Sequence, residues 1–130
     1  MRMQTPMRTP LKQARGLGSA RGGAEHFWRQ RITALANVPL TVFFLYTLVT
    51  LAGADHAAVV AYFKFPISAL LIMLFVISSA WHMMLGLQVI IEDYIHHEGF
   101  KIAALVGNIL FTAFFGLICI YAIVKLSLGG

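Results

Sequence analysis

Charged side chains are scarce in this chain of 130 residues, since Asp, Glu, Lys and Arg together make up only 12% of it. Soluble domains carry about 25% charged residues. Three stretches contain none of these four residue types, namely 32–54, 65–91 and 102–124, with 23, 27 and 23 residues. A helix needs about 20 apolar residues to cross a bilayer. The low charge therefore argues against a soluble domain and predicts an all-α membrane protein with three transmembrane helices, at about 32–54, 65–91 and 102–125.

The chain also has few of the residues that other classes of site require. It has one cysteine, Cys119, which lies inside the third apolar run and is interpreted as a small packing residue. A disulfide framework or a thiolate metal cluster within the chain is therefore excluded. A Gly-rich dinucleotide motif is missing too, so the sequence indicates no site for flavin or succinate.

Acidic residues are missing from the first 24 positions, whereas basic residues are concentrated there. Residues 1–31 hold seven of the ten basic side chains and one acid, Glu25. Four glycines and two prolines in residues 1–24 predict a flexible basic arm, followed by a three-helix anchor domain over residues 25–130. No folded basic surface accompanies this arm, so we expect membrane lipids and no nucleic acid as its partners.

The basic arm also predicts how the chain is placed in its membrane. The positive-inside rule keeps such an arm in the cytoplasm, which puts the loop 92–101 on the same side and the C-terminus on the other. The first 30 residues have no apolar core for a secretory signal peptide. Mitochondrial transit peptides share the Arg-rich, acid-poor start, but the Gly and Pro content works against their amphipathic helix. We therefore predict a bacterial inner (cytoplasmic) membrane rather than a mitochondrial one.

Prolines and a polar segment mark the ends of the apolar runs. Residues 53–64 contain Gly, Asp, His and Lys and are predicted to form a short loop. Pro39 should kink or loosen the first span. Pro66 suits the first turn of the second helix.

His82 is the one ionisable side chain in the stretch 65–91. Ionisable residues inside a membrane are costly and usually face protein, water or a ligand. On a helix, the residues that share its stripe are Gly86, Val89, Ile90 and Asp93. Gly86 should leave a notch one turn from the imidazole, where a flat ligand or another helix can approach. Tyr94 lies about 18 Å further along the axis, near the water boundary.

The residues alone leave several roles open. His82 is a packing residue, a proton relay or a cofactor ligand such as an axial ligand of haem iron. Neither the first nor the third apolar run contains a second histidine, so a bis-histidine haem would need one from another chain. Ser78 and Ser79 could bond the imidazole or a cofactor edge, but we expect them to bond to carbonyls of their own helix, as serines in membrane helices often do. Asp93 and Tyr94 form either an ordinary interfacial helix end or a site for a quinone head. Arg31 either anchors the helix at the interface or pairs with a carboxylate such as a haem propionate.

The string from His82 to Tyr94 is similar to a known signature. That signature is a histidine, a glycine four positions later, a glutamine two after that and then Asp-Tyr, and here these are His82, Gly86, Gln88, Asp93 and Tyr94. It is typical of the cytochrome b-binding D subunits, the smaller hydrophobic membrane anchors of succinate dehydrogenase (complex II). The segment 27–34, Phe-Trp-Arg-Gln-Arg-Ile-Thr-Ala, also resembles the approach to the first span in that family. The resemblance covers roughly residues 22–128.

The resemblance implies a membrane anchor subunit of a succinate:quinone oxidoreductase, non-catalytic alone. His82 would be one axial ligand of the haem b iron, with the second from the cytochrome b C subunit. Tyr94 and Asp93 would bind ubiquinone beside the iron–sulfur subunit, and Arg31 would lie near the haem propionates. Electrons would come from succinate through the flavoprotein subunit and the iron–sulfur clusters. The alternatives are a fumarate reductase anchor and a cofactor-free three-helix structural or transport subunit.

Overall fold

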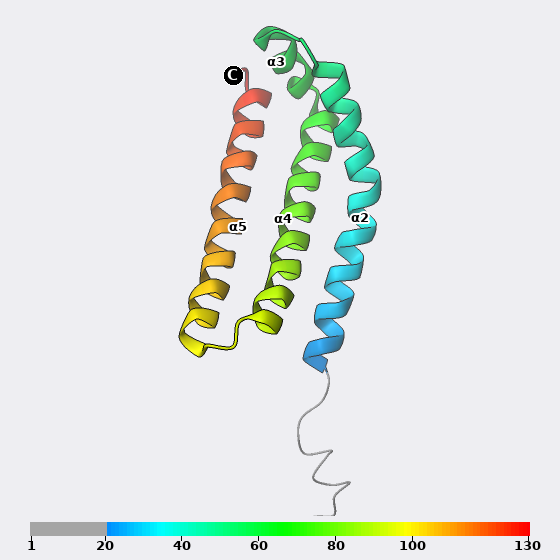
Figure 1. Cartoon of the computed structure of the whole chain (residues 1–130). Coiled ribbons are helices and arrows are strands. Elements are labelled where there is room, and N and C mark those ends of the chain that lie inside the picture. Colours follow the sequence, from blue (N-terminus) through cyan, green and yellow to red (C-terminus); the bar gives the residue numbers. More distant parts are fainter. Residues whose placement is uncertain (1–20) are drawn as a thin grey trace, which may run out of the picture.

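Three long helices dominate the computed structural model, which describes residues 21–130 (Figure 1). They are α2 (Arg21–Leu51), α4 (Pro66–Tyr94) and α5 (Glu98–Ser127), and a short helix α3 (His56–Lys64) follows α2. All three long helices are long and apolar enough to cross a membrane. The predicted all-α membrane fold with three spanning helices is confirmed.

The first helix extends further toward the N-terminus than the apolar run suggested. α2 begins at Arg21, so residues 21–24, which were predicted to belong to the flexible arm, form its first turn. The rest of the predicted arm, residues 1–20, lies outside the described part of the chain. α2 continues unbroken through Pro39, which therefore lies in the middle of the helix. A membrane helix tolerates such a proline when neighbouring groups satisfy the carbonyl that it frees.

The prediction of a loop between the first two spans was wrong for most of that segment. Residues 56–64 form α3, whose N-cap is Asp55: its Oδ1 accepts a hydrogen bond of 2.9 Å from the backbone N–H of Ala58. An alanine-rich segment that follows an aspartate favours a helix, but this segment is too short to show helical periodicity in the sequence. Before it, α2 ends in a turn in which Gly53 adopts a φ of +76°, a conformation that glycine adopts at little cost.

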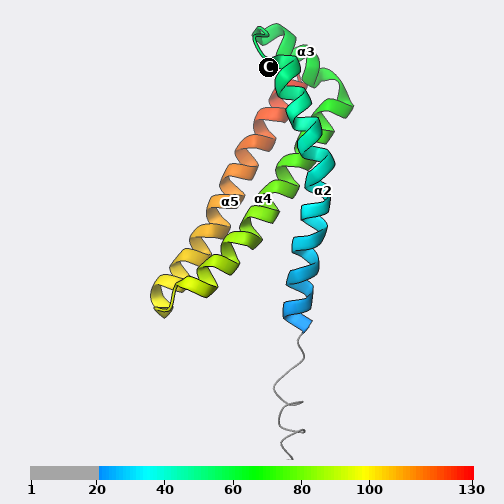
Figure 2. The same cartoon turned by 45° about the vertical axis from the view of Figure 1, so that its right-hand side comes forward.

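α4 lies between α2 and α5 and packs against both (Figure 1). Seen from a second direction, α4 and α5 stay together, whereas α2 diverges from them toward its N-terminal end (Figure 2). α3 lies at the other end of the bundle, where it contacts α4 and α5. α2 therefore separates from α4 and α5 at the end where residues 21–30 and residues 88–100 lie.

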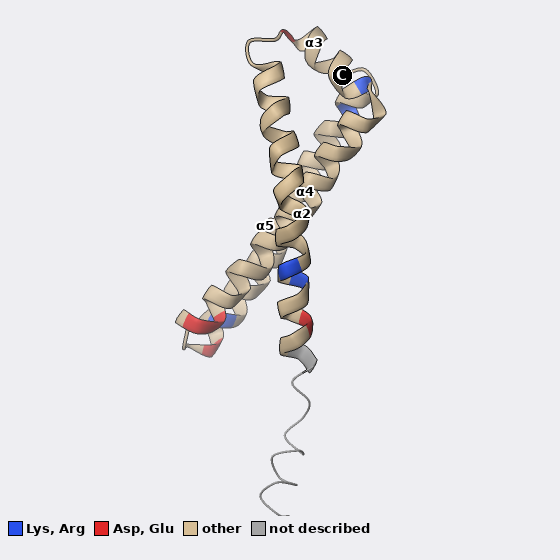
Figure 3. Ribbon diagram, turned by 90° about the vertical axis from the view of Figure 1, so that its right-hand side faces the viewer, with Lys and Arg blue, Asp and Glu red and all other residues tan. Residues whose placement is uncertain are grey.

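The apolar core is small and sits near α3. Its buried residues come from α3, α4 and α5 and are Phe63, Ala69, Ile72 and Ile123. Most other apolar side chains point outward, so that Leu35 is 76% exposed and Leu117 is 67% exposed. Within residues 21–130, the charged positions lie toward the two ends of the bundle (Figure 3). Such a surface suits contact with lipid or with other apolar helices, because an outward-facing leucine in hydrocarbon is not exposed to water.

Candidate functional site

His82 lies at the contact between α2 and α4, half-buried among side chains of both helices. Its Nδ1 lies 3.0 Å from Oγ1 of Thr33 on α2. The described part of the chain offers no hydrogen-bond partner to Nε2, the other ring nitrogen. A histidine that ligates a metal commonly uses one ring nitrogen while a neighbour holds the other. At this contact the chain thus offers one imidazole as a possible metal ligand, which fits half of a bis-histidine haem site.

Two serines one turn before His82 connect α4 to α2 instead of to their own helix. Ser78 Oγ donates to the backbone carbonyl of Thr33 at 3.5 Å, and Ser79 Oγ donates to Oδ1 of Asn37 at 3.4 Å. The expectation that these serines bond to carbonyls of their own helix was therefore wrong. The reason is that α2 brings polar groups to within reach, which the local sequence of α4 does not reveal. Together the three contacts hold α2 and α4 in one register around the imidazole.

Gly86 allows the close approach that its missing side chain predicted. A Cβ atom placed there would lie 3.6 Å from Nε2 of Gln30, so the side chain of Gln30 fills the notch. Gln30 belongs to α2, so α2 makes the close approach at Gly86. The stripe through His82 therefore faces α2 at His82 and Gly86. Its members nearer the end of α4, Val89, Ile90 and Asp93, are exposed, because α2 has diverged from α4 at that level.

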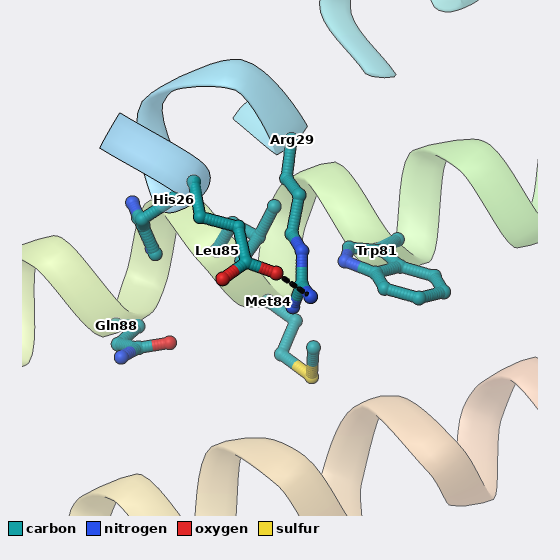
Figure 4. Close-up of a pocket in the computed structure, with 7 residues that line it drawn as sticks. His26, Arg29, Trp81, Met84, Leu85 and Gln88 are labelled. Carbon is teal, nitrogen blue, oxygen red and sulfur yellow. Dashed lines mark hydrogen bonds and ion pairs between the residues drawn. The ribbon is translucent and has the colours of Figure 1, made fainter. Parts of the chain in front are cut away.

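An open pocket of about 250 Å³ lies where α2 leaves α4 (Figure 4). α2 contributes Glu25, His26 and Arg29, of which Arg29 pairs with Glu25. α4 contributes an apolar wall and one amide, namely Trp81, Met84, Leu85 and Gln88. The pocket thus combines charged groups on one helix with an apolar wall on the other, close to the charged end of the bundle.

A second groove continues along the α2–α4 contact from this pocket, and Trp81 lines both. It has a volume of about 330 Å³ and is almost entirely apolar. Thr33, Ser78 and Trp81 are among its lining residues, so it passes beside Thr33, the hydrogen-bond partner of His82. A flat apolar ligand that reached the imidazole from this side would meet carbon surfaces and few polar groups.

The predicted quinone residues lie at the end of α4. Tyr94 is the last residue of that helix and is 78% exposed, and Asp93 before it is exposed as well. Neighbouring polar groups bind each other: Gln88 Nε2 donates to Glu92 Oε1 at 2.8 Å, and Lys101 Nζ donates to the backbone carbonyl of Glu92 at 3.1 Å. Since α4 is continuous, about 18 Å of helix axis separates His82 from Tyr94.

Arg31 lies on a different face of α2 from Thr33. Its side chain is exposed, and its guanidinium carbon is 5.0 Å from the centre of the Phe27 ring. Two residues along a helix turn the side chain by about 200°. The chain by itself therefore does not bring Arg31 to His82, although both lie near the same level of the bundle.

The third span contributes polar groups to α4 but no imidazole. Asn108 of α5 is buried and donates through Nδ2 to the backbone carbonyl of Met84 at 2.9 Å. Thr112, one turn further on, is also buried, and its Oγ1 has no partner within the described residues. Hydrogen bonds of this kind hold membrane helices together.

Sequence reasoning found His82 but missed the residue that holds it. Thr33 lies 49 positions before His82, in a run where its hydroxyl gives no sign of a partner. Arg29 and His26 were also missed as wall residues of the pocket. One signal was available for Thr33, because Gln30, Thr33 and Asn37 form a polar stripe at helical spacing along an apolar helix.

Comparisons with known proteins agree with this picture. The model of the family described as "Succinate dehydrogenase/Fumarate reductase transmembrane subunit" matches residues 5–124. A protein of Paracoccus denitrificans named succinate dehydrogenase hydrophobic membrane anchor subunit is 34% identical over 121 residues, which cover 93% of each chain. A protein of the same name from Rickettsia bellii is 33% identical over 110 residues, 85% of this chain and 88% of its own length. No solved structure matches the chain significantly.

Proposed function

Because the chain belongs to the family of succinate dehydrogenase/fumarate reductase transmembrane subunits, we propose that it supplies one axial ligand of haem b and part of the ubiquinone site. Membership predicted from the residues is thus confirmed, as is the role of a membrane anchor. The chain is a multi-pass membrane protein and a non-catalytic subunit of its complex. The proposal concerns what its residues do there, in electron transfer from succinate to quinone.

The haem proposal rests on one observation, namely that only one ring nitrogen of His82 has a hydrogen-bond partner among the described residues. Nδ1 is engaged by Thr33, and Nε2 remains for a ligand. The apolar parts of α2 and α5 contain no other histidine, and the family resemblance implies that the second axial ligand would come from the cytochrome b C subunit. Bound haem b would supply a one-electron redox centre at this depth. The part of this chain is to hold the iron and to keep water away with the apolar walls of the groove.

Arg31 is proposed as the partner of a haem propionate, because the resemblance of residues 27–34 to the family's approach to the first span implies that role. A guanidinium can bind a carboxylate through two parallel hydrogen bonds. In the isolated chain it stacks on Phe27 and faces outward. We therefore propose that Arg31 would reach a propionate from the outward face of α2, and that this face contacts the C subunit.

The end of α4 is proposed as this chain's share of the ubiquinone site. The phenol of Tyr94 is exposed and has a hydrogen to donate to a quinone carbonyl. The carboxylate of Asp93 lies beside it and can take part in proton delivery as the quinone is reduced. Both lie at the end of the bundle where α2 begins, which we place on the cytoplasmic side of a bacterial inner membrane. The iron–sulfur subunit, with the flavoprotein subunit behind it, would dock there.

Absorption spectroscopy of the purified complex tests the haem proposal. The reduced complex should show the Soret and alpha bands of b-type haem. His82→Ala should abolish both bands while the chain still co-purifies with its partner subunits, because an alanine provides no ligand. His96→Ala, which removes an exposed loop histidine, is the matched control and should leave the bands unchanged. A native complex without b-type bands, or bands that persist in His82→Ala, would contradict the proposal.

A further inference from the structure

The hydroxyl of Thr33 lies where three groups converge. Its Oγ1 is 2.9 Å from the carbonyl oxygen of Arg29, 3.1 Å from that of Gln30 and 3.0 Å from Nδ1 of His82. A hydroxyl has one hydrogen to donate and two lone pairs that accept. The two carbonyl oxygens only accept, so they compete for the hydrogen, and the lone pairs remain for a donor on the imidazole.

Threonines in membrane helices commonly donate their hydroxyl hydrogen to the carbonyl three or four residues earlier. Both distances to Arg29 and Gln30 fit that arrangement. With the hydrogen placed there, Nδ1 of His82 must carry the hydrogen of the third contact. The neutral imidazole then has its free lone pair on Nε2, the nitrogen without a partner among residues 23–130.

From this arrangement we propose that Thr33 is a positioning residue for the haem ligand: by accepting the Nδ1–H of His82, it selects the tautomer whose Nε2 binds the iron and fixes the plane of the ring. The inference rests on the proposed haem ligation by His82 and adds to it a residue of a different helix. An acceptor at the second nitrogen also makes a ligating imidazole more basic.

The surrounding contacts keep Thr33 in place. Ser78 donates to the backbone carbonyl of Thr33 itself, and Ser79 donates to Asn37 one turn further along α2. Gln30 rests on Gly86 on the other side of the imidazole. α2 therefore cannot turn or slide without breaking contacts on both sides of Thr33, so its hydroxyl stays in line with the ring.

Substitution of Thr33 in the whole complex tests this role. Thr33→Val removes the hydroxyl and keeps the shape, and Thr33→Ser keeps the hydroxyl. The matched control is Thr50→Val, because Thr50 lies on the same helix and its hydroxyl donates only to the carbonyl of Tyr46, at 2.8 Å. The readouts are the rate at which haem is lost to added apomyoglobin and the midpoint potential of the haem, neither of which requires turnover.

We expect Thr33→Val to lose haem about 10- to 100-fold faster than the native complex. This is the range by which metal affinity typically falls when the hydrogen-bond partner of a metal-ligating histidine is removed. Its potential should shift upward, because a less basic imidazole stabilises the ferric state less. Thr33→Ser and Thr50→Val should behave like the native complex. If Thr33→Val does not assemble, Thr33→Ala takes its place.

Equal haem loss and potential in Thr33→Val and Thr50→Val would overturn the inference. So would a failure of both Thr33→Val and Thr33→Ala to assemble while Thr33→Ser assembles, because the hydroxyl would then serve folding. Failure of the proposed function is distinguishable: in that case the native complex lacks b-type haem, or His82→Ala retains it. A haem that depends on His82 but not on Thr33 refutes this inference alone.

Discussion

Single side chains at two depths of α4 carry the proposed chemistry. His82 lies inside the apolar part of the bundle, and Tyr94 lies exposed at its edge. The sequence revealed both, because an ionisable group in an apolar run and an acid–aromatic pair at its end are visible without any structure. Their partners were not visible. Thr33 acquires a role only because α2 packs against α4 with its polar stripe facing the imidazole.

At the residue scale, Tyr94→Phe tests the quinone site. The substitution removes the hydroxyl that would donate to a quinone carbonyl, and the loss of such a bond, about 1.4 kcal/mol, corresponds to roughly tenfold in rate. Quinone reduction should fall by about that factor, while succinate oxidation by a soluble dye persists. Tyr121→Phe, at an exposed tyrosine of α5, is the control and should change neither rate. An unchanged rate of quinone reduction in Tyr94→Phe would refute the quinone assignment.

Among the elements, α3 shows how a short helix closes the bundle away from the site. Its buried Val60 and Phe63 face the long helices, and the hydroxyl of Tyr62 lies 2.8 Å from Oγ1 of Thr47 on α2. In sequence the segment looked like a loop, because nine residues are too few to show helical periodicity. Packing against α4 and α5 supplies the stability that so short a helix lacks on its own.

The N-cap of α3 provides a prediction at this scale. Asp55→Ala removes the bond to the N–H of Ala58, which should destabilise the start of α3 by about 1 kcal/mol. The amide hydrogens of Ala58 and Val59, which bond to Asp55, should then exchange about fivefold faster, as measured by mass spectrometry of the complex. Asp55→Asn also caps a helix and should leave the exchange nearly unchanged. Equal acceleration in both variants would show that the cap bond does not stabilise α3.

The whole molecule is a layer of helices with apolar surfaces on the outside and charges at both ends (Figure 3). Three spanning helices place the start of α2 and the loop between α4 and α5 at one end, and α3 with the C-terminus at the other (Figure 1). The basic residues before α2 favour the cytoplasm for the first end. The exposed Tyr94 then lies on the side where we place the iron–sulfur subunit.

Thiol labelling tests this placement of the whole chain. In a Cys119→Ser background, His96→Cys should react with a membrane-impermeant maleimide only in inverted vesicles, because the proposed orientation puts this loop in the cytoplasm. Ala57→Cys, on an exposed position of α3, should react only in intact cells with a permeabilised outer membrane. The opposite pattern would reverse the orientation. Labelling of both positions from one side would contradict the single span, α4, that we place between α3 and the loop.

The sequence alone determined the membrane class, the three spans, the place of His82 within the second apolar run and the family signature. Each of these follows from local properties, namely runs without charge, helical spacing and an ordered string of residues. The tertiary structure alone decided that Thr33 holds the imidazole, that Gln30 fills the notch at Gly86 and that Arg31 faces away. These facts depend on how α2 is rotated and placed against α4. That rotation is set by many weak interhelical contacts at once, which no single stretch of sequence encodes.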